Sequence, residues 1–272
     1  TDFSLIKKIE THQSLKTCPS LLIPVSDKTG EPLRIGITNT HLFYSKRNLL
    51  ILNEIQKKNN RPASWKAHAT ALINSKMNRW PRQRGPLSLT LFVGSIVYEN
   101  NIFKTTNNRR FPISILEQNI ISTQSSTHLS GIKNSLDYVF IDPPFGSNIY
   151  YSDLNIVWES WLRLRTNNDK EAIESKAQSK SSEDYRVLMK ASFQKAYEML
   201  KPGRWITVEF SNTKASIWNH IQTALTEAGF IVANVSALDK KQGSFNAVSN
   251  PTSVKQDLVI SAYKPNGGFE DR

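Results

Sequence analysis

Apolar and polar positions in the second half of the chain follow two spacings, one typical of strands and one typical of helices. The apolar runs that predict strands cover residues 120–123, 137–141, 205–210, 230–238 and 258–263. The stripes at helical spacing that predict helices cover residues 153–164, 185–200 and 217–228. Alternation of strands with helices is typical of an α/β fold, and it predicts a mostly parallel sheet with helices on both faces.

The first 111 residues show a less regular pattern. It predicts helices near residues 3–9, within 41–56 and within 64–79, and a strand at 87–97. Ser45 and Asn48 are candidate caps of the second helix. We therefore divide the chain into a basic N-terminal region, residues 1–111, which is a candidate substrate-binding part, and an α/β region, residues 112–266.

Positive charge is concentrated in one part of the chain. The net charge is +12, and residues 43–114 contain thirteen Lys and Arg residues against two Glu residues. Aromatic residues are interleaved with these cations, a composition that suits binding to a phosphate backbone. The arginines that could meet phosphate are Arg82, Arg84, Arg109 and Arg110, together with Arg163 and Arg165 near the predicted helix at 153–164. A solvated basic face that increases solubility is the alternative interpretation.

Composition excludes several kinds of site. The one cysteine, Cys18, excludes an internal disulfide and a cysteine-based zinc site, and the five histidines show no ligand spacing, so no metal is expected. No apolar stretch approaches the roughly 20 residues of a membrane span, and the N-terminus lacks a secretory signal pattern. These features predict a protein of the prokaryotic cytoplasm, associated with the nucleoid, without a membrane partner.

The stretch with the clearest chemical potential is Asp142-Pro143-Pro144-Phe145, which follows the apolar run at 138–141. Neither proline can continue a strand ladder, so the motif predicts a stiff corner at the carboxyl end of a strand, where ligands bind in open α/β sheets. Asp142 and the Pro143 carbonyl could accept the two hydrogens of a nucleobase amino group. Phe145 could stack on the base, which contributes about 1–3 kcal/mol. An ordinary proline-rich turn capped by Asp142 is the alternative.

This motif resembles motif IV of the S-adenosylmethionine-dependent amino-methyltransferases, which methylate N6 of adenine or N4 of cytosine in DNA. The longer run at 141–155 is similar to the large bacterial adenine-specific DNA methylases, as are residues 36–49 and 255–260. The resemblance implies a partial Rossmann-like methyltransferase sheet over residues 112–266, with the last two strands antiparallel at one edge. It also implies S-adenosyl-L-methionine as cofactor, DNA as partner and a place in DNA methylation or restriction-modification.

The resemblance assigns roles to particular residues. Catalysis on a flipped base is expected at Asp142, Pro143, Pro144 and Phe145. Contacts with the cofactor are expected from Asp142, and more weakly from His41 and Lys46. Contacts with the substrate are expected from Phe145, Asn148, Tyr150 and Tyr151. The basic charge of the N-terminal region, and not the resemblance, adds the arginines at 82, 84, 109 and 110 to this set.

One feature of a complete enzyme of this type is missing. The sequence has no Phe-x-Gly-x-Gly turn, whose glycines let the backbone approach the cofactor. Because the sequence also does not begin with Met, we expect it to be the C-terminal part of a longer methylase. A second subunit that carries the glycine-rich motif, or a decayed enzyme, is the alternative. An RNA amino-methyltransferase and a non-catalytic nucleic-acid-binding module also remain open.

Overall fold

The computed structural model describes residues 3–58, 68–78, 86–87, 89–107, 124–211, 215–239 and 256–268. The chain forms two compact units. The first unit contains Thr1–Asn119 and Tyr150–Asn168, and the second contains Ile120–Ile149 and Asp169–Arg272. The helical segment at 150–168 therefore packs with the N-terminal residues, which differs from the predicted continuous region at 112–266.

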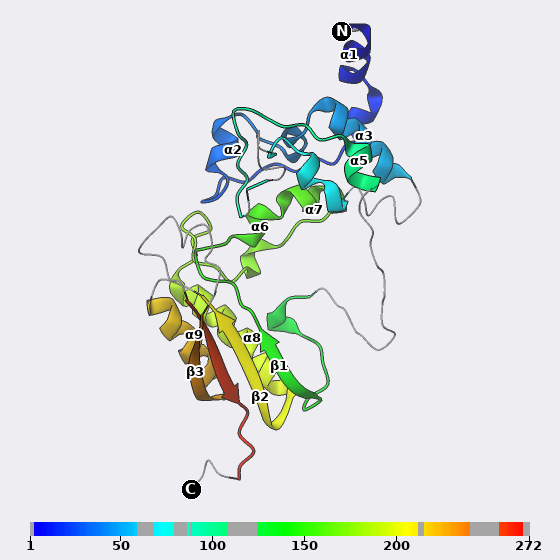
Figure 1. The fold of residues 1–272 in the computed structure, drawn as a ribbon. Helices are drawn as coiled ribbons and strands as arrows, with labels where there is room; N and C mark the ends of the chain where they lie inside the picture. Colours follow the sequence, from blue (N-terminus) through cyan, green and yellow to red (C-terminus); the bar gives the residue numbers. More distant parts are fainter. Residues whose placement is uncertain are drawn as a thin grey trace. The chain divides into compact units, whose positions relative to one another are not determined.

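A four-stranded sheet forms the centre of the second unit (Figure 1). Its strands are β1 (Leu136–Ile141), β2 (Leu200–Phe210), β3 (Ile231–Asp239) and β4 (Gln256–Tyr263). The spatial order is β1-β2-β4-β3, with β1 parallel to β2 and β4 antiparallel to both of its neighbours. The prediction of a mostly parallel sheet is therefore wrong for these strands, because β4 inserts between β2 and β3 in the opposite direction. The expected antiparallel pairing of the last two strands is confirmed.

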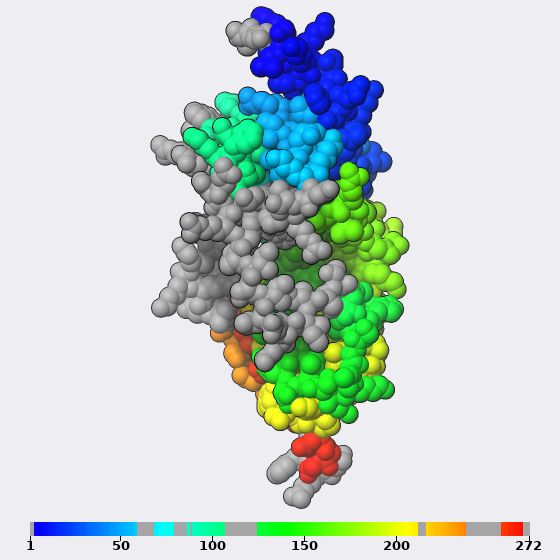
Figure 2. Space-filling view, turned by 90° about the vertical axis from the view of Figure 1, so that its right-hand side faces the viewer, coloured from blue at the N-terminus to red at the C-terminus, as the bar shows by residue number. Residues whose placement is uncertain are grey.

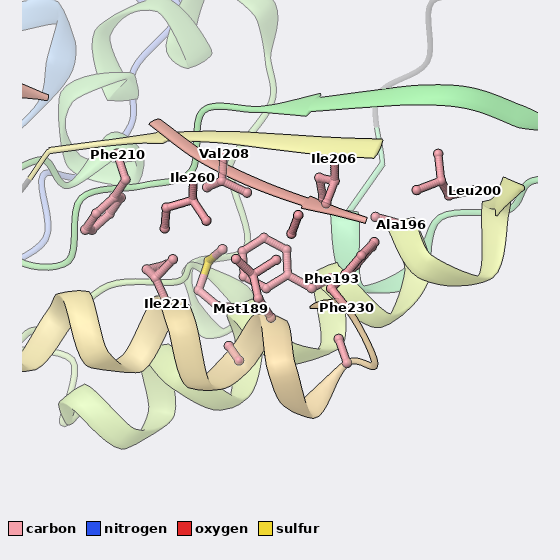
Figure 3. Packing of buried hydrophobic residues seen from close by; sticks show 14 of the residues in the cluster. Met189, Phe193, Ala196, Leu200, Ile206, Val208, Phe210, Ile221, Phe230 and Ile260 are labelled. Atoms are coloured by element: carbon pink, nitrogen blue, oxygen red, sulfur yellow. The ribbon is translucent and has the colours of Figure 1, made fainter. Parts of the chain in front are cut away.

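Two helices, α8 (Ser182–Met199) and α9 (Ala215–Glu227), pack against one face of this sheet. Alternate residues of β2, namely Ile206, Val208 and Phe210, are fully buried, as the two-residue period of a strand requires. Figure 3 shows these side chains pointing toward Met189, Phe193 and Ile221 on the helices. The alternating positions Tyr138, Phe140 and Trp205 point the other way and are about half exposed. The described helices α8 and α9 thus cover one face of the sheet, whereas the sequence predicted helices on both faces.

The first unit consists mainly of short helices around a separate apolar core. Its α-helices are α1 (Phe3–Glu10), α2 (Gly30–Arg34), α3 (Lys46–Lys57), α5 (Ile102–Asn107), α6 (Tyr151–Leu154) and α7 (Ile156–Leu162). Its 3₁₀ helices include η1 (Gln13–Thr17), η2 (Thr40–Phe43) and η3 (Leu72–Asn74). Figure 2 shows the blue-green segment of α5 beside the lighter blue segment of α3. Ser45 caps α3 as predicted, because its hydroxyl accepts from the Asn48 N–H at 3.2 Å.

Two further predictions for this unit need correction. The expected helix at 153–164 is divided at Asn155 into α6 and α7. The described residues of 87–97 contain no strand, and Leu89 has a φ of 60°, which is incompatible with an extended backbone. An apolar run by itself therefore did not specify a strand here. No described helix has the length and apolar character needed to span a bilayer.

Candidate functional site

The Asp142-Pro143-Pro144-Phe145 corner follows directly after β1, at the carboxyl end of the strand. The parallel register pairs Ile141 with Val208, so the corner lies beside the end of β2. There the half-buried Phe145 ring packs edge-on against Phe210, with centroids 5.5 Å apart and an interplanar angle of 80°. Phe210 packs in turn against Trp218 of α9 at 4.8 Å. The aromatic ring of the motif is thus anchored in the core of the second unit.

A buried tyrosine also fixes the corner. The Tyr185 hydroxyl of α8 donates to the Pro144 carbonyl at 2.7 Å. Burial raises the pKa of Tyr185 above its ordinary value of 10, so the phenol keeps the proton that it donates. After the corner, the Asn148 N–H donates to the Phe145 carbonyl at 3.3 Å, and Gly146 adopts a φ of 65° that completes the turn.

The Asp142 side chain is exposed, unlike the prolines and the ring that follow it. Among the residues that the structure describes, its carboxylate makes no hydrogen bond or ion pair. The corner therefore combines a fixed backbone with a carboxylate that is accessible as an acceptor. An interior position of Asp142, which would have excluded a role in binding a base, is not observed.

The structure brings the predicted residues together only in part. Asn148 lies exposed in the turn after the motif, in the same unit. Tyr150 and Tyr151 begin α6 in the first unit, where the Lys28 ammonium lies 5.1 Å from the centre of the buried Tyr150 ring. Four predicted residues, Arg82, Arg84, Arg109 and Arg110, lie outside the described part of the chain.

The two weaker cofactor candidates also lie in the first unit and have partners there. His41 Nδ1 is 2.8 Å from the Ser20 hydroxyl oxygen, and burial, followed by the nearby Lys76, lowers the pKa of His41. Lys46 forms an ion pair with Glu10 at 3.4 Å. Both side chains thus have local structural roles, and their contact with a cofactor stays a prediction.

Sequence reasoning missed the side chains that support the corner. Tyr185 was assigned only to the apolar face of a helix, and Phe210 only to a strand. A buried tyrosine usually needs a partner for its hydroxyl, which is the signal that could have linked Tyr185 to a main-chain carbonyl. Within the described residues, no cluster of three His, Cys, Asp or Glu side chains could hold a metal ion. A pocket of about 700 Å³ is found in the first unit and is not lined by the motif.

The chain is similar to several solved structures over about half of its length. No protein-family model matches the chain, and no curated protein matches it. One similar solved structure is TTHA0409 of Thermus thermophilus, a provisionally named DNA modification methylase, with 14% identity, a TM-score of 0.32, and coverage of 51% of this chain and 48% of that chain. The same protein complexed with S-adenosyl-L-methionine aligns with 13% identity, a TM-score of 0.30, and coverage of 53% and 54%.

The [4+2]-cyclase SpnF aligns to a similar extent, with 12% identity, a TM-score of 0.31, and coverage of 54% of this chain and 57% of that chain. The alignments thus span about half of these solved chains. Such TM-scores and identities do not establish a shared fold.

Proposed function

We propose that this chain carries the target-base site of an S-adenosyl-L-methionine-dependent DNA methyltransferase that acts on N6 of adenine or N4 of cytosine. The observation that supports it is the anchored corner after β1, which combines an exposed Asp142 carboxylate with a Phe145 ring held by Phe210. The carboxyl ends of parallel strands are where open α/β sheets bind ligands. The antiparallel pairing of β3 with β4 also agrees with what the resemblance implies.

In this proposal the motif orients an amino group. Asp142 accepts one hydrogen of the flipped base, and the Pro143 carbonyl accepts the other, so the nitrogen lone pair turns out of the base plane. S-adenosyl-L-methionine supplies the methyl group. Asp142 need not be a strong base, because the amino proton becomes acidic as the new N–C bond forms. The Tyr185 hydrogen bond to Pro144 keeps the acceptors in place.

The cofactor-binding half is proposed to come from an upstream segment of a longer protein or from a second subunit. Among the described strands, β1 pairs only with β2, so its other edge could accept a further strand. The half-exposed aromatic side chains of Tyr138, Phe140 and Trp205 lie on the sheet face that α8 and α9 do not cover. Both features suit a strand and a helix that are supplied by the missing half.

Methyl transfer to DNA tests the proposal. In the protein that contains this chain and its cofactor-binding half, Asp142→Ala should reduce the rate of methyl incorporation into duplex DNA by about 100-fold or more, because the side-chain acceptor for the amino group is lost. Asp137→Ala, an equivalent change at an exposed carboxylate of the preceding strand, is the matched control and should retain activity. DNA binding should be unchanged in both variants.

Three outcomes would contradict the proposal. The first is undiminished methyl transfer by the Asp142→Ala variant. The second is methyl incorporation into structured RNA and not into DNA, which would favour the RNA enzyme. The third is no incorporation into either nucleic acid when the wild-type protein binds S-adenosyl-L-methionine.

A further inference from the structure

The first unit contains a pocket of about 700 Å³, formed where the chain that leaves η1 meets the end of α7. Its walls are residues 16–21, Ser160 and residues 163–165. This volume lies within the range of about 300–1,000 Å³ that is usual for sites that bind small molecules. All of its walls belong to the same unit, so the pocket is a property of that unit alone.

The charge of the walls has one sign. Lys16, Arg163 and Arg165 line the pocket, and no acidic residue does. Within the described residues, the Lys16 and Arg163 side chains make no ion pair. Arg165 is held in place, because it donates to the Ser152 carbonyl at 3.1 Å and lies 3.6 Å from the Glu159 carboxylate. Two cations are therefore uncompensated beside a third that is fixed.

The backbone at the end of α7 directs these side chains. Arg163 adopts the left-handed conformation, with φ 55° and ψ 37°, which costs a non-glycine residue about 1–2 kcal/mol. The Arg163 N–H donates to the Ser160 carbonyl, and the Leu164 N–H donates to the Glu159 carbonyl at 3.0 Å. This reversal ends the helix and brings residues 163–165 to the pocket in succession.

The rest of the pocket combines hydroxyl and apolar side chains. Thr17, Ser20 and Ser160 contribute hydroxyl groups, and Pro19, Leu21 and Leu164 contribute apolar surface beside the cations. Burial raises the pKa of the Cys18 thiol to about 11, so the thiol is neutral near pH 7 and adds no negative charge. A ligand that matches these walls combines an anionic group with a body that presents both oxygen atoms and C–H surface, as a sugar-phosphate unit does.

We propose that this pocket binds one sugar-phosphate unit of the DNA backbone. Lys16 and Arg163 pair with the phosphate, and Leu21 and Leu164 pack against the sugar. The proposal rests on the proposed function for the identity of the nucleic acid. It adds a contact that fixes the register of the DNA, separate from the corner that would receive the base.

DNA affinity as a function of salt concentration tests this contact. The double variant Lys16→Gln/Arg163→Gln should bind a fluorescent duplex oligonucleotide about 10–100-fold more weakly, and the slope of log affinity against log salt should fall by about one to two. Arg34→Gln/Lys8→Gln removes the same charge from exposed positions of the same unit and should weaken binding by less than about threefold. Circular dichroism spectra that match the wild type would confirm that the variants are folded.

Equal effects of the two double variants would overturn the proposal, because general electrostatic attraction would then explain the loss. Adenosine monophosphate tests whether the ligand is a free nucleotide. If it binds saturably to the wild type and not to the pocket variant, while duplex affinity is unchanged in that variant, the backbone assignment is wrong. The methyl-transfer assay described above separates this contact from the proposed function. DNA binding through this pocket without methyl transfer in that assay would support the contact and contradict the proposed enzyme.

Discussion

The buried Lys264 offers a stringent test of how the second unit is held together. Its ammonium donates to three oxygens, each at 2.8 Å: the Asn134 side chain and the main-chain carbonyls of Tyr197 and Leu200. It also lies 4.5 Å from the centre of the Tyr197 ring. One side chain at the end of β4 thus links the C-terminus of α8, the start of β2 and the turn before β1.

Lys264→Met keeps an unbranched apolar chain of similar length and removes the ammonium. A hydrogen bond to a charged group contributes about 1.5–3 kcal/mol, but removing the ammonium from water costs part of that gain. A buried acceptor that is left without its donor typically costs about 1–3 kcal/mol. Since two of the three acceptors are main-chain carbonyls at element ends, we expect a loss of about 3 kcal/mol in the free energy of unfolding.

Urea denaturation followed by circular dichroism measures this loss, and thermal unfolding should show a fall in Tm of about 6–12 °C. Lys201→Met is the control, because Lys201 forms an exposed ion pair with Asp137 that should contribute less than about 1 kcal/mol. If the two variants lose the same stability, or if Lys264→Met loses none, the three hydrogen bonds do not contribute as the geometry implies.

Two further predictions concern helix α9. Gly229→Ala should lower the free energy of unfolding, measured in urea, by about 1–3 kcal/mol, because Gly229 has a φ of 102° and an added Cβ would lie 3.1 Å from the Tyr197 ring. Gly30→Ala is the control and should not lower it, because an added Cβ there meets no atom within 4 Å. Equal losses in the two variants would contradict the steric explanation. Hydrogen bonds from Lys190 and Arg186 hold the pKa of Glu227 below its ordinary value of 4.5. The ionised carboxylate therefore stabilises the folded state above pH 4.5, and this stabilisation is lost as the pH falls through the lowered pKa. Glu227→Gln should therefore lower the free energy of unfolding near neutral pH and make this free energy less sensitive to acid below pH 4.5. If the urea midpoints of the wild type and the variant change with pH in parallel, ionisation of Glu227 does not contribute to stability.

The elements that the sequence predicted well are those whose signals are local. The α8 helix is amphipathic and starts with a capping box between Ser181 and Asp184, and the second half of β2 alternates between fully buried and more exposed residues. The strand before Asp142 was also predicted within one residue of its start. In each case the spacing within one segment already determines which face is apolar.

The features that local spacing did not predict depend on partners far away in the sequence. Residues 150–168 pack in the first unit, where the Trp161 indole donates to the Tyr44 hydroxyl at 2.9 Å across 117 positions. No local spacing encodes that contact. The direction of β4 was available only from the resemblance, because an alternating pattern is identical for parallel and antiparallel pairing. The hydrogen bond from Tyr185 to the Pro144 carbonyl likewise connects residues 41 positions apart.

Because the Asp142 carboxylate is exposed, water competes with any ligand that it could bind. A carboxylate in water forms weak contacts with an amino group, because water competes for both partners. Contacts within the chain already fix the corner: the Phe145 ring packs against Phe210, and the Tyr185 hydroxyl donates to the Pro144 carbonyl. The geometry of the corner therefore does not depend on a ligand. Under the proposed function, the corner also needs a cover that excludes water from Asp142 when the base is bound. If that function holds, orientation of the amino group should depend on closure of the site by the DNA and by the proposed cofactor-binding half, and Asp142 in the isolated chain should bind a free nucleobase only weakly.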